Sequence, residues 1–86
     1  MAQYEIQFKT SSAKEFRKLP PDIKLRIREA INALKTDPRP AGVKKLAGES
    51  KLYRIRIADY RVIYEIDDST QMLRIMCVRH RRDVYQ

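Results

Sequence analysis

The stretch from Lys44 to Asp68 constrains the fold of this chain more than any other stretch. Within it, residues 52–57 and 60–66 both alternate between apolar and polar positions, and a short turn at Ala58 and Asp59 separates them. Alternation with a period of two is typical of half-buried strands, and two such strands across a tight turn form a hairpin. The apolar face of this predicted hairpin carries Tyr53, Ile55, Ile57, Tyr60, Val62, Tyr64 and Ile66.

The remaining positions of the hairpin carry arginine near the turn, at Arg54, Arg56 and Arg61. Arginines at alternate strand positions are compatible with an ordinary solvated sheet face. They are also well suited to phosphate groups, because the planar guanidinium donates two parallel hydrogen bonds. The direction of Arg61 stays open, since it shares its side of the strand with the apolar Ile63.

The length of 86 residues predicts one domain, residues 1–86, with a single core layer. Any chemistry is therefore expected on an open groove rather than in a deep cavity. The formal net charge of +8 comes from an excess of basic residues in both halves of the chain. A folded, uniformly basic small domain indicates a polyanionic partner, most often nucleic acid, and excludes a neutral scaffold as the default interpretation.

Cysteine and histidine are scarce, with one residue of each, so a zinc site cannot be assembled from typical ligands. Cys77 lies in an apolar run, where a buried structural thiol is more common than a reactive one. The chain has no apolar signal core and no run approaching the roughly 20 residues that span a membrane. We expect a cytoplasmic protein without a cofactor and without membrane contact.

The order of the predicted elements is β-α-α-β-β-β. Residues 3–9 alternate as a first strand, and Ser12 with Glu15 has the spacing of a capping box for a helix over residues 13–19. A second helix begins at Pro21 or Asp22, and its apolar stripe is Ile23, Ile27, Ala30, Ile31 and Leu34. Residues 43–46 are a short strand or an extended entry to the hairpin, and residues 71–78 form the last strand. The fold class is α+β, an antiparallel sheet with an N-terminal helical hairpin packed on one face.

The last strand leads into a second concentration of reactive side chains, namely Arg79, His80, Arg81 and Tyr85. If this run lies beside the hairpin, these residues converge with its arginines on one open surface. RNA supplies its own nucleophile, the 2′-hydroxyl, so cleavage needs charge stabilisation by a cation together with a base and an acid. Histidine is the side chain most often used for proton transfer near neutral pH, which makes His80 a candidate, and Tyr85 could also move protons. A histidine at a strand end is often a surface residue, however, and a terminal tyrosine can fray.

Four motifs appear in order: residues 45–48 (KLAG), 52–56 (LYRIR), 59–64 (DYRVIY) and 78–85 (VRHRRDVY). Together with Phe16-Arg17-Lys18-Leu19-Pro20 ahead of the long helix, they resemble the RelE group of the RelE/ParE toxin superfamily, and the resemblance spans nearly the whole chain. It implies the RelE-like fold and the toxin of a type II toxin–antitoxin pair. It also implies a metal-free endoribonuclease that cuts mRNA in the A site of the 70S ribosome through 2′-hydroxyl attack, which leaves a 2′,3′-cyclic phosphate.

The resemblance assigns roles to particular residues. It makes Arg61 the cation for transition-state charge and adds Arg81, His80 and Tyr85 as the other catalytic candidates, with Arg81 preferred over Arg79 as the C-terminal arginine. The expected RNA-binding residues are Arg54, Arg56, Lys51, Lys45 and Arg79. The best-known ribosome-dependent members carry lysine where Arg54 and Arg56 stand, which argues against a general-base role for either residue.

The resemblance also implies a cognate antitoxin whose acidic C-terminal segment wraps the toxin, and the positive charge of this chain agrees with such a partner. Because the chain ends at Gln86, it lacks the C-terminal helix of some members, and its groove is expected to be open from the start. Two alternatives remain within the superfamily. One is a ParE-type inhibitor of DNA gyrase without nuclease activity, and the other is an inert relative that binds only RNA or the antitoxin.

Overall fold

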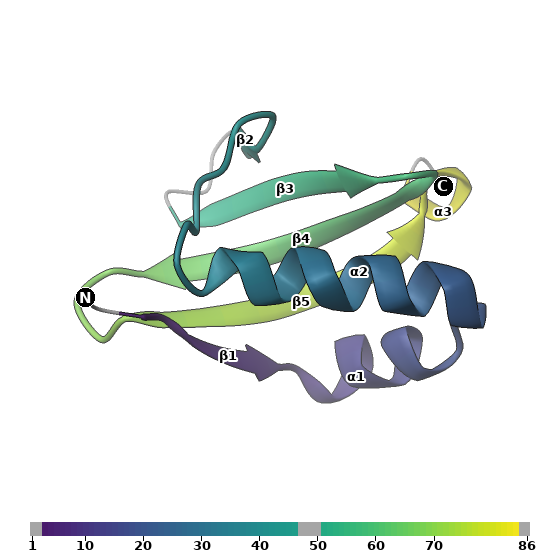
Figure 1. Ribbon diagram of the computed structural model, residues 1–86, viewed down its shortest axis with the longest axis horizontal. Coiled ribbons are helices and arrows are strands. Elements are labelled where there is room, and N and C mark those ends of the chain that lie inside the picture. Colours follow the sequence, from purple (N-terminus) through teal and green to yellow (C-terminus); the bar gives the residue numbers. More distant parts are fainter. Residues whose placement is uncertain (1–2, 47–50, 85–86) are drawn as a thin grey trace.

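The computed structural model describes residues 3–46 and 51–84, which form a five-stranded sheet and three helices. In chain order the elements are β1 (Glu5–Phe8), α1 (Thr10–Arg17), α2 (Pro21–Leu34), β2 (Lys44–Lys45), β3 (Leu52–Ile57), β4 (Tyr60–Asp67), β5 (Met72–His80) and α3 (Arg81–Val84). The α+β class and the N-terminal pair of helices are confirmed (Figure 1). The short helix α3 was not predicted.

The sheet has the order β1-β5-β4-β3-β2. Three of its four pairings are antiparallel, but β1 runs parallel to β5, with Ile6 opposite Leu73 and Phe8 opposite Ile75. The predicted antiparallel sheet is therefore confirmed for these three pairings, and the β1–β5 pairing departs from it. Tight turns force antiparallel pairing in the β3-β4-β5 meander, whereas a two-helix crossover leads from β1 to the opposite edge of the sheet and imposes no such direction.

Helix α2 begins as predicted, with Pro21 in its first turn, where the missing N–H has no intrahelical partner. Its stripe of Ile27, Ile31 and Leu34 is buried against the sheet, as the 3.6-residue periodicity predicts. These three side chains form one core with residues of the sheet face, namely Ile57, Val62, Tyr64, Ile66, Leu73, Ile75 and Val78. The hydroxyl of the fully buried Tyr64 donates to the carbonyl of Pro38 at 2.8 Å.

The predicted capping box at Ser12 and Glu15 is wrong, because α1 begins two residues before Ser12, at Thr10. Ser12 is fully buried, and its hydroxyl lies 2.9 Å from the carbonyl of Lys9 and 2.7 Å from that of Ile75. Glu15 instead reaches β5, where its carboxylate accepts from the N–H of Val78 at 3.0 Å. Both side chains therefore fasten α1 to β5 just beyond the point where β1 ends (Figure 1).

Strand β5 contains a bulge at Met76. Tyr64 pairs with Ile75, but the preceding residue Ile63 pairs with Cys77, so β5 has one residue more than β4 at this point. Because side chains alternate along a strand, the extra residue exchanges the two faces for the rest of β5. Val78 is consequently buried in the core, and Arg79 points to the opposite face of the sheet.

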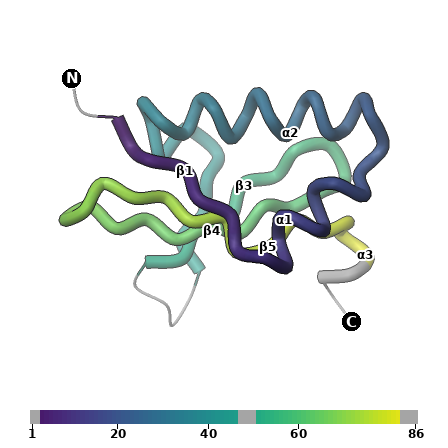
Figure 2. The backbone as a smooth tube through the Cα atoms, turned by 90° about the horizontal axis from the view of Figure 1, so that it is seen from below, coloured from purple at the N-terminus to yellow at the C-terminus, as the bar shows by residue number. Residues whose placement is uncertain are grey.

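Helix α2 covers one face of the sheet, and α1 lies along the β5 edge (Figure 2). Both β2 and α3 project on the side away from α2, at opposite ends of the sheet (Figure 2). The uncovered face therefore has a raised element at each end. Among the described helices, none has the length and apolar character needed to cross a membrane.

Candidate functional site

A hollow of about 330 Å³ lies on the uncovered face, between β2, β3 and β4. It is lined by Gly42, Lys44, Arg54, Arg56 and Arg61. Four of these five residues are cations, and no acidic side chain is among them. Gly42 precedes β2 with a φ of +89°, a backbone conformation that glycine adopts without steric cost. The structure thus brings together the three arginines that the hairpin pattern singled out.

Like charges lie directly opposite one another in this hollow. Lys44 of β2 pairs in register with Arg54 of β3, and Arg56 of β3 pairs with Arg61 of β4. Like-charged residues at opposite positions of an antiparallel pair destabilise the sheet. A bound anion would relieve this repulsion, so the arrangement is suited to a phosphate-rich ligand.

Arg61 occupies the centre of a row of three arginines. Its register partners are Arg56 on β3 and Arg79 on β5, and neighbouring strands lie about 4.8 Å apart. Arg61 is 6% exposed, whereas Arg56 and Arg79 are exposed. A cation shielded from water exerts a stronger field than one in bulk solvent, so Arg61 is the charge that a ligand in the hollow meets at greatest strength.

Arg79 connects this row to α1. Its Nε donates to Oε2 of Glu15 at 2.9 Å, while the other carboxylate oxygen accepts from the N–H of Val78. The carboxylate of Glu15 thereby fixes the direction of the Arg79 side chain at the edge of β5. This role of Glu15 could not be predicted from the sequence, because it depends on α1 lying beside the end of β5.

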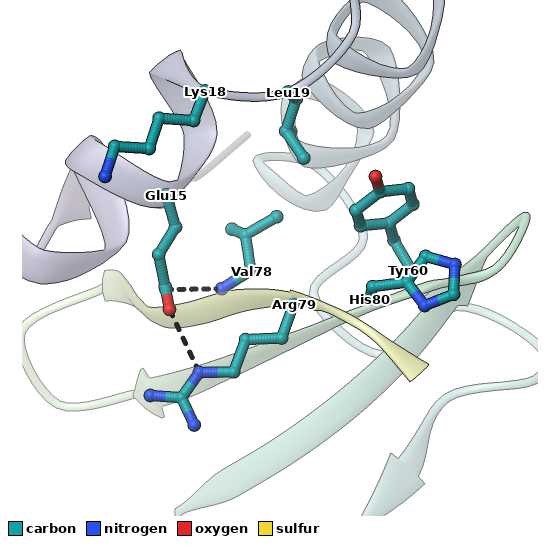
Figure 3. A pocket seen from close by; sticks show the side chains of 7 residues that line it. All are labelled: Glu15, Lys18, Leu19, Tyr60, Val78, Arg79 and His80. Carbon is teal, nitrogen blue, oxygen red and sulfur yellow. Dashed lines mark hydrogen bonds and ion pairs between the residues drawn. The ribbon is translucent and has the colours of Figure 1, made fainter. Parts of the chain in front are cut away.

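His80 does not lie in the arginine hollow. It pairs with Tyr60, its ring meets the Tyr60 ring edge-on with 5.2 Å between centroids, and both line a different hollow on the helix side of the sheet (Figure 3). The expectation that His80 shares one surface with Arg54, Arg56 and Arg61 was wrong. The bulge at Met76 is the cause, because it directs position 79 to the uncovered face and position 80 to the helix side.

The other predicted RNA-binding lysines lie outside the hollow. Lys45 pairs with Tyr53, so it shares the side of the sheet that Tyr53 occupies, and Lys51 forms an ion pair with Asp67 at 3.7 Å. The neighbouring Lys44 lines the hollow instead. The sequence could have identified Lys44 only if the register of the two-residue strand β2 had been known.

The C-terminal candidate Arg81 lies near the hairpin turn. Arg81 begins α3, and its backbone N–H donates to the carbonyl of Asp59 at 2.7 Å. This hydrogen bond holds the start of α3 against the turn between β3 and β4. Tyr85 lies outside the described residues. Among the residues that the structure describes, no three His, Cys, Asp or Glu side chains gather as a metal site would require.

A separate polar cluster at the far end of the sheet is structural. Arg39 donates to Asp68 at 2.8 Å and to the hydroxyl of Tyr53 at 3.1 Å, and the Tyr4 hydroxyl donates to the same carboxylate. The hydrogen bond from Arg39, and after it the bond from Tyr4, holds the pKa of Asp68 below its ordinary value. The hydrogen bond to Asp68 in turn raises the pKa of Tyr4. With its charges paired internally, this cluster is a poor candidate for ligand binding.

The fold and the hollow together define a small α+β protein whose uncovered sheet face is built to attract anions. Comparison with known proteins agrees with this class. A family described as "ParE toxin of type II toxin-antitoxin system, parDE" matches residues 6–85. Toxin RelG of Mycobacterium tuberculosis is 33% identical over 87 residues, which cover 96% of this chain and 97% of RelG.

Solved structures match over nearly the whole chain as well. A chain of the RelBE2 toxin–antitoxin complex from Mycobacterium tuberculosis superposes with a TM-score of 0.80 at 31% identity, covering 92% of this chain and 99% of that one. A chain of the archaeal RelE–RelB complex from Pyrococcus horikoshii gives a TM-score of 0.82 at 30% identity, covering 92% and 96%. This chain belongs to the RelE/ParE superfamily of toxins from type II toxin–antitoxin systems.

Proposed function

We propose that this toxin is a RelE-type endoribonuclease that cleaves mRNA in the ribosomal A site. The observation that carries the proposal is the arginine hollow, which holds four cations at paired register positions and no acidic group among its lining residues. Such a surface suits the phosphates of a single RNA strand. A ribosomal target also places the protein in the cytoplasm.

In this proposal, the 2′-hydroxyl of the RNA attacks the adjacent phosphorus, the bond to the 5′ oxygen breaks, and a 2′,3′-cyclic phosphate forms. Negative charge accumulates on the phosphate oxygens in the transition state. Arg61 is the residue to stabilise this charge, because it is 6% exposed and needs little rearrangement of water to act. Arg54, Arg56 and Lys44 bind the strand and orient it, and Arg79 extends the row toward β5.

The proton transfers need a different group, since the described lining of the hollow consists of arginine, lysine and glycine. His80 faces the helix side, which favours Tyr85 over His80 as the proton carrier. A backbone hydrogen bond to Asp59 holds Arg81 at the hairpin turn. Arg81 would therefore assist the reaction from the end of the sheet where Arg56 and Arg61 lie.

We also propose that the chain is neutralised by a cognate antitoxin. Solved relatives include RelBE and RelE–RelB complexes, in which toxin and antitoxin crystallised together. The formal charge of +8 and the uncovered basic face suit an acidic segment that becomes ordered as it binds. Such a segment would occupy the hollow in place of RNA.

The test is primer extension on a defined mRNA after induction in cells. We expect cuts within translated codons for the wild type and none for Arg61→Ala. Arg74→Ala is the matched control, because Arg74 is an exposed arginine of the same sheet that lies opposite Glu65, away from the hollow. Circular dichroism on the purified variants would establish that each one is folded.

Two results would overturn the proposal. One is unchanged cleavage by a folded Arg61→Ala protein. The other is growth arrest with intact mRNA, which would favour the ParE-type alternative that the matching family suggests. A supercoiling assay with purified DNA gyrase would then show inhibition. If neither mRNA cleavage nor gyrase inhibition occurs, the inert relative is the remaining interpretation.

A further inference from the structure

The hollow on the helix side of the sheet has features that the proposed cleavage reaction does not use. It has a volume of about 490 Å³, within the range of roughly 300–1,000 Å³ that is typical of small-ligand sites. Glu15, Lys18 and Leu19 at the end of α1 form one wall, and Tyr60 and His80 form the other (Figure 3). Val78 and Arg79 of β5 lie between the two walls (Figure 3).

The aromatic wall has a fixed orientation. Tyr60 and His80 are paired in register, their rings meet at 85°, and both side chains are half-buried. The backbone N–H of Arg82 donates to Nδ1 of His80 at 3.2 Å, so the neutral ring carries its proton on Nε2. The wall therefore offers ring surface together with a hydroxyl and an imidazole N–H, which are groups that recognise a nucleobase.

The opposite wall supplies a positive charge. Among the described residues, the Lys18 ammonium takes part in no hydrogen bond or ion pair, and the residue is exposed. The Glu15 carboxylate does not cancel this charge, because it already accepts from Arg79 and from the backbone of Val78. An anion entering the hollow therefore meets a cation with little competition from the acidic group beside it.

We propose that this hollow binds a nucleotide unit, with the base against the Tyr60–His80 ring pair and the phosphate beside the Lys18 ammonium. The unit is either a free mononucleotide or part of an RNA strand, since both present the same base and phosphate. The proposal goes beyond the cleavage function, because the residues that would contact the base and the phosphate, namely Tyr60, His80 and Lys18, do not line the arginine hollow.

The test is an NMR titration of the full chain with AMP, GMP, adenosine, inorganic phosphate and a short oligoribonucleotide. With AMP or GMP we expect saturable shifts of the Tyr60 and His80 ring protons and weaker shifts with adenosine. We expect Lys18→Glu to weaken AMP binding roughly fivefold, because it reverses the charge that pairs with the phosphate. Lys14→Glu is the matched control, since Lys14 is an exposed lysine of α1 that does not line the hollow.

Each outcome decides the proposal. Saturable ring-proton shifts with AMP or GMP support the proposal with a free mononucleotide as the ligand. Ring-proton shifts with the oligoribonucleotide alone support it with an RNA strand as the ligand. Ring signals that stay unmoved while the arginine hollow responds to RNA overturn it and leave the cleavage proposal standing. Equal losses in Lys18→Glu and Lys14→Glu, or ring shifts produced by an acidic peptide but by no nucleotide, also overturn it.

Discussion

Replacing Arg56 by glutamine should stabilise the fold while it weakens RNA binding. Arg56 is exposed on β3 and lies directly opposite Arg61, so its removal takes away a repulsive cross-strand pair. Cross-strand charge pairs contribute roughly 0.2–1 kcal/mol. In a domain of this size, that gain corresponds to a rise in Tm of about 1–8 °C. Because Arg56 is exposed and partly screened by water, we expect the lower half of this range.

High salt should remove the difference in Tm between Arg56→Gln and wild type. The Debye length falls from about 10 Å at 0.1 M salt to about 3 Å at 1 M, below the roughly 4.8 Å between neighbouring strands. Thermal unfolding followed by circular dichroism should therefore show a higher Tm for Arg56→Gln than for wild type at low salt and nearly equal values at 1 M. RNA binding offers a second readout, the slope of the logarithm of the binding constant against the logarithm of the salt concentration. Its magnitude should fall by about 0.7 if Arg56 contacts one phosphate of a single strand.

Arg74→Gln is the control for this prediction, because Arg74 is an exposed arginine of the same sheet whose register partner is Glu65. Its loss removes an attractive pair, so the Tm at low salt should fall slightly. The reasoning is refuted if both substitutions shift the Tm in the same direction by the same amount, or if Arg56→Gln destabilises the fold at low salt.

Three further predictions concern stability and reactivity. Ser12→Ala should cost about 1 kcal/mol in the free energy of unfolding, measured by urea denaturation, because the buried hydroxyl bonds to Ile75; an unchanged midpoint would contradict this. The pKa of Asp68 is lowered chiefly by Arg39, so the stability it contributes is present above the ordinary value near 3.8 and is lost as the pH falls below it. The Tm difference between wild type and Asp68→Asn should accordingly shrink from pH 7 toward pH 2, and a constant difference would count against it. Burial raises the pKa of Cys77, so iodoacetamide should alkylate the native thiol several-fold more slowly than the urea-unfolded chain at pH 7, and equal rates would exclude a shielded thiol.

The meander of strands was predictable because its signals are local. Alternation of period two fixes which residues of β3 and β4 face the core, and the turn at Ala58 and Asp59 fixes their pairing. Arg54 and Arg56 therefore emerge on the uncovered face, where the structure places them. The direction of Arg61 stayed open in the sequence, and its register with Arg56 places it on the same face. The apolar stripe of α2 was equally readable, since a 3.6-residue period appears in the sequence alone.

Features that depend on contacts distant in the sequence were not predictable. Ser12 and Glu15 have the spacing of a capping box, yet both side chains bind β5, more than 60 residues further along the chain. The direction of β1 relative to β5 was not predictable either, because β1 is joined to the other strands through two helices and no tight turn sets its pairing. Lys44 was missed for a related reason, because a strand of two residues is too short to show an alternation.

The bulge at Met76 has a consequence for the way related toxins are compared. If a related toxin lacks the bulge, an alignment without a gap opposite Met76 would match Arg79 of this chain with a residue that faces the helices in the relative. Such an alignment would treat the structural counterpart of His80 as the counterpart of Arg79. Functional equivalence at the end of β5 therefore follows strand register, and residue identity alone is a poor guide. Loss of the single residue at position 76 would remove the bulge and leave Arg79 opposite Arg61 and His80 opposite Tyr60.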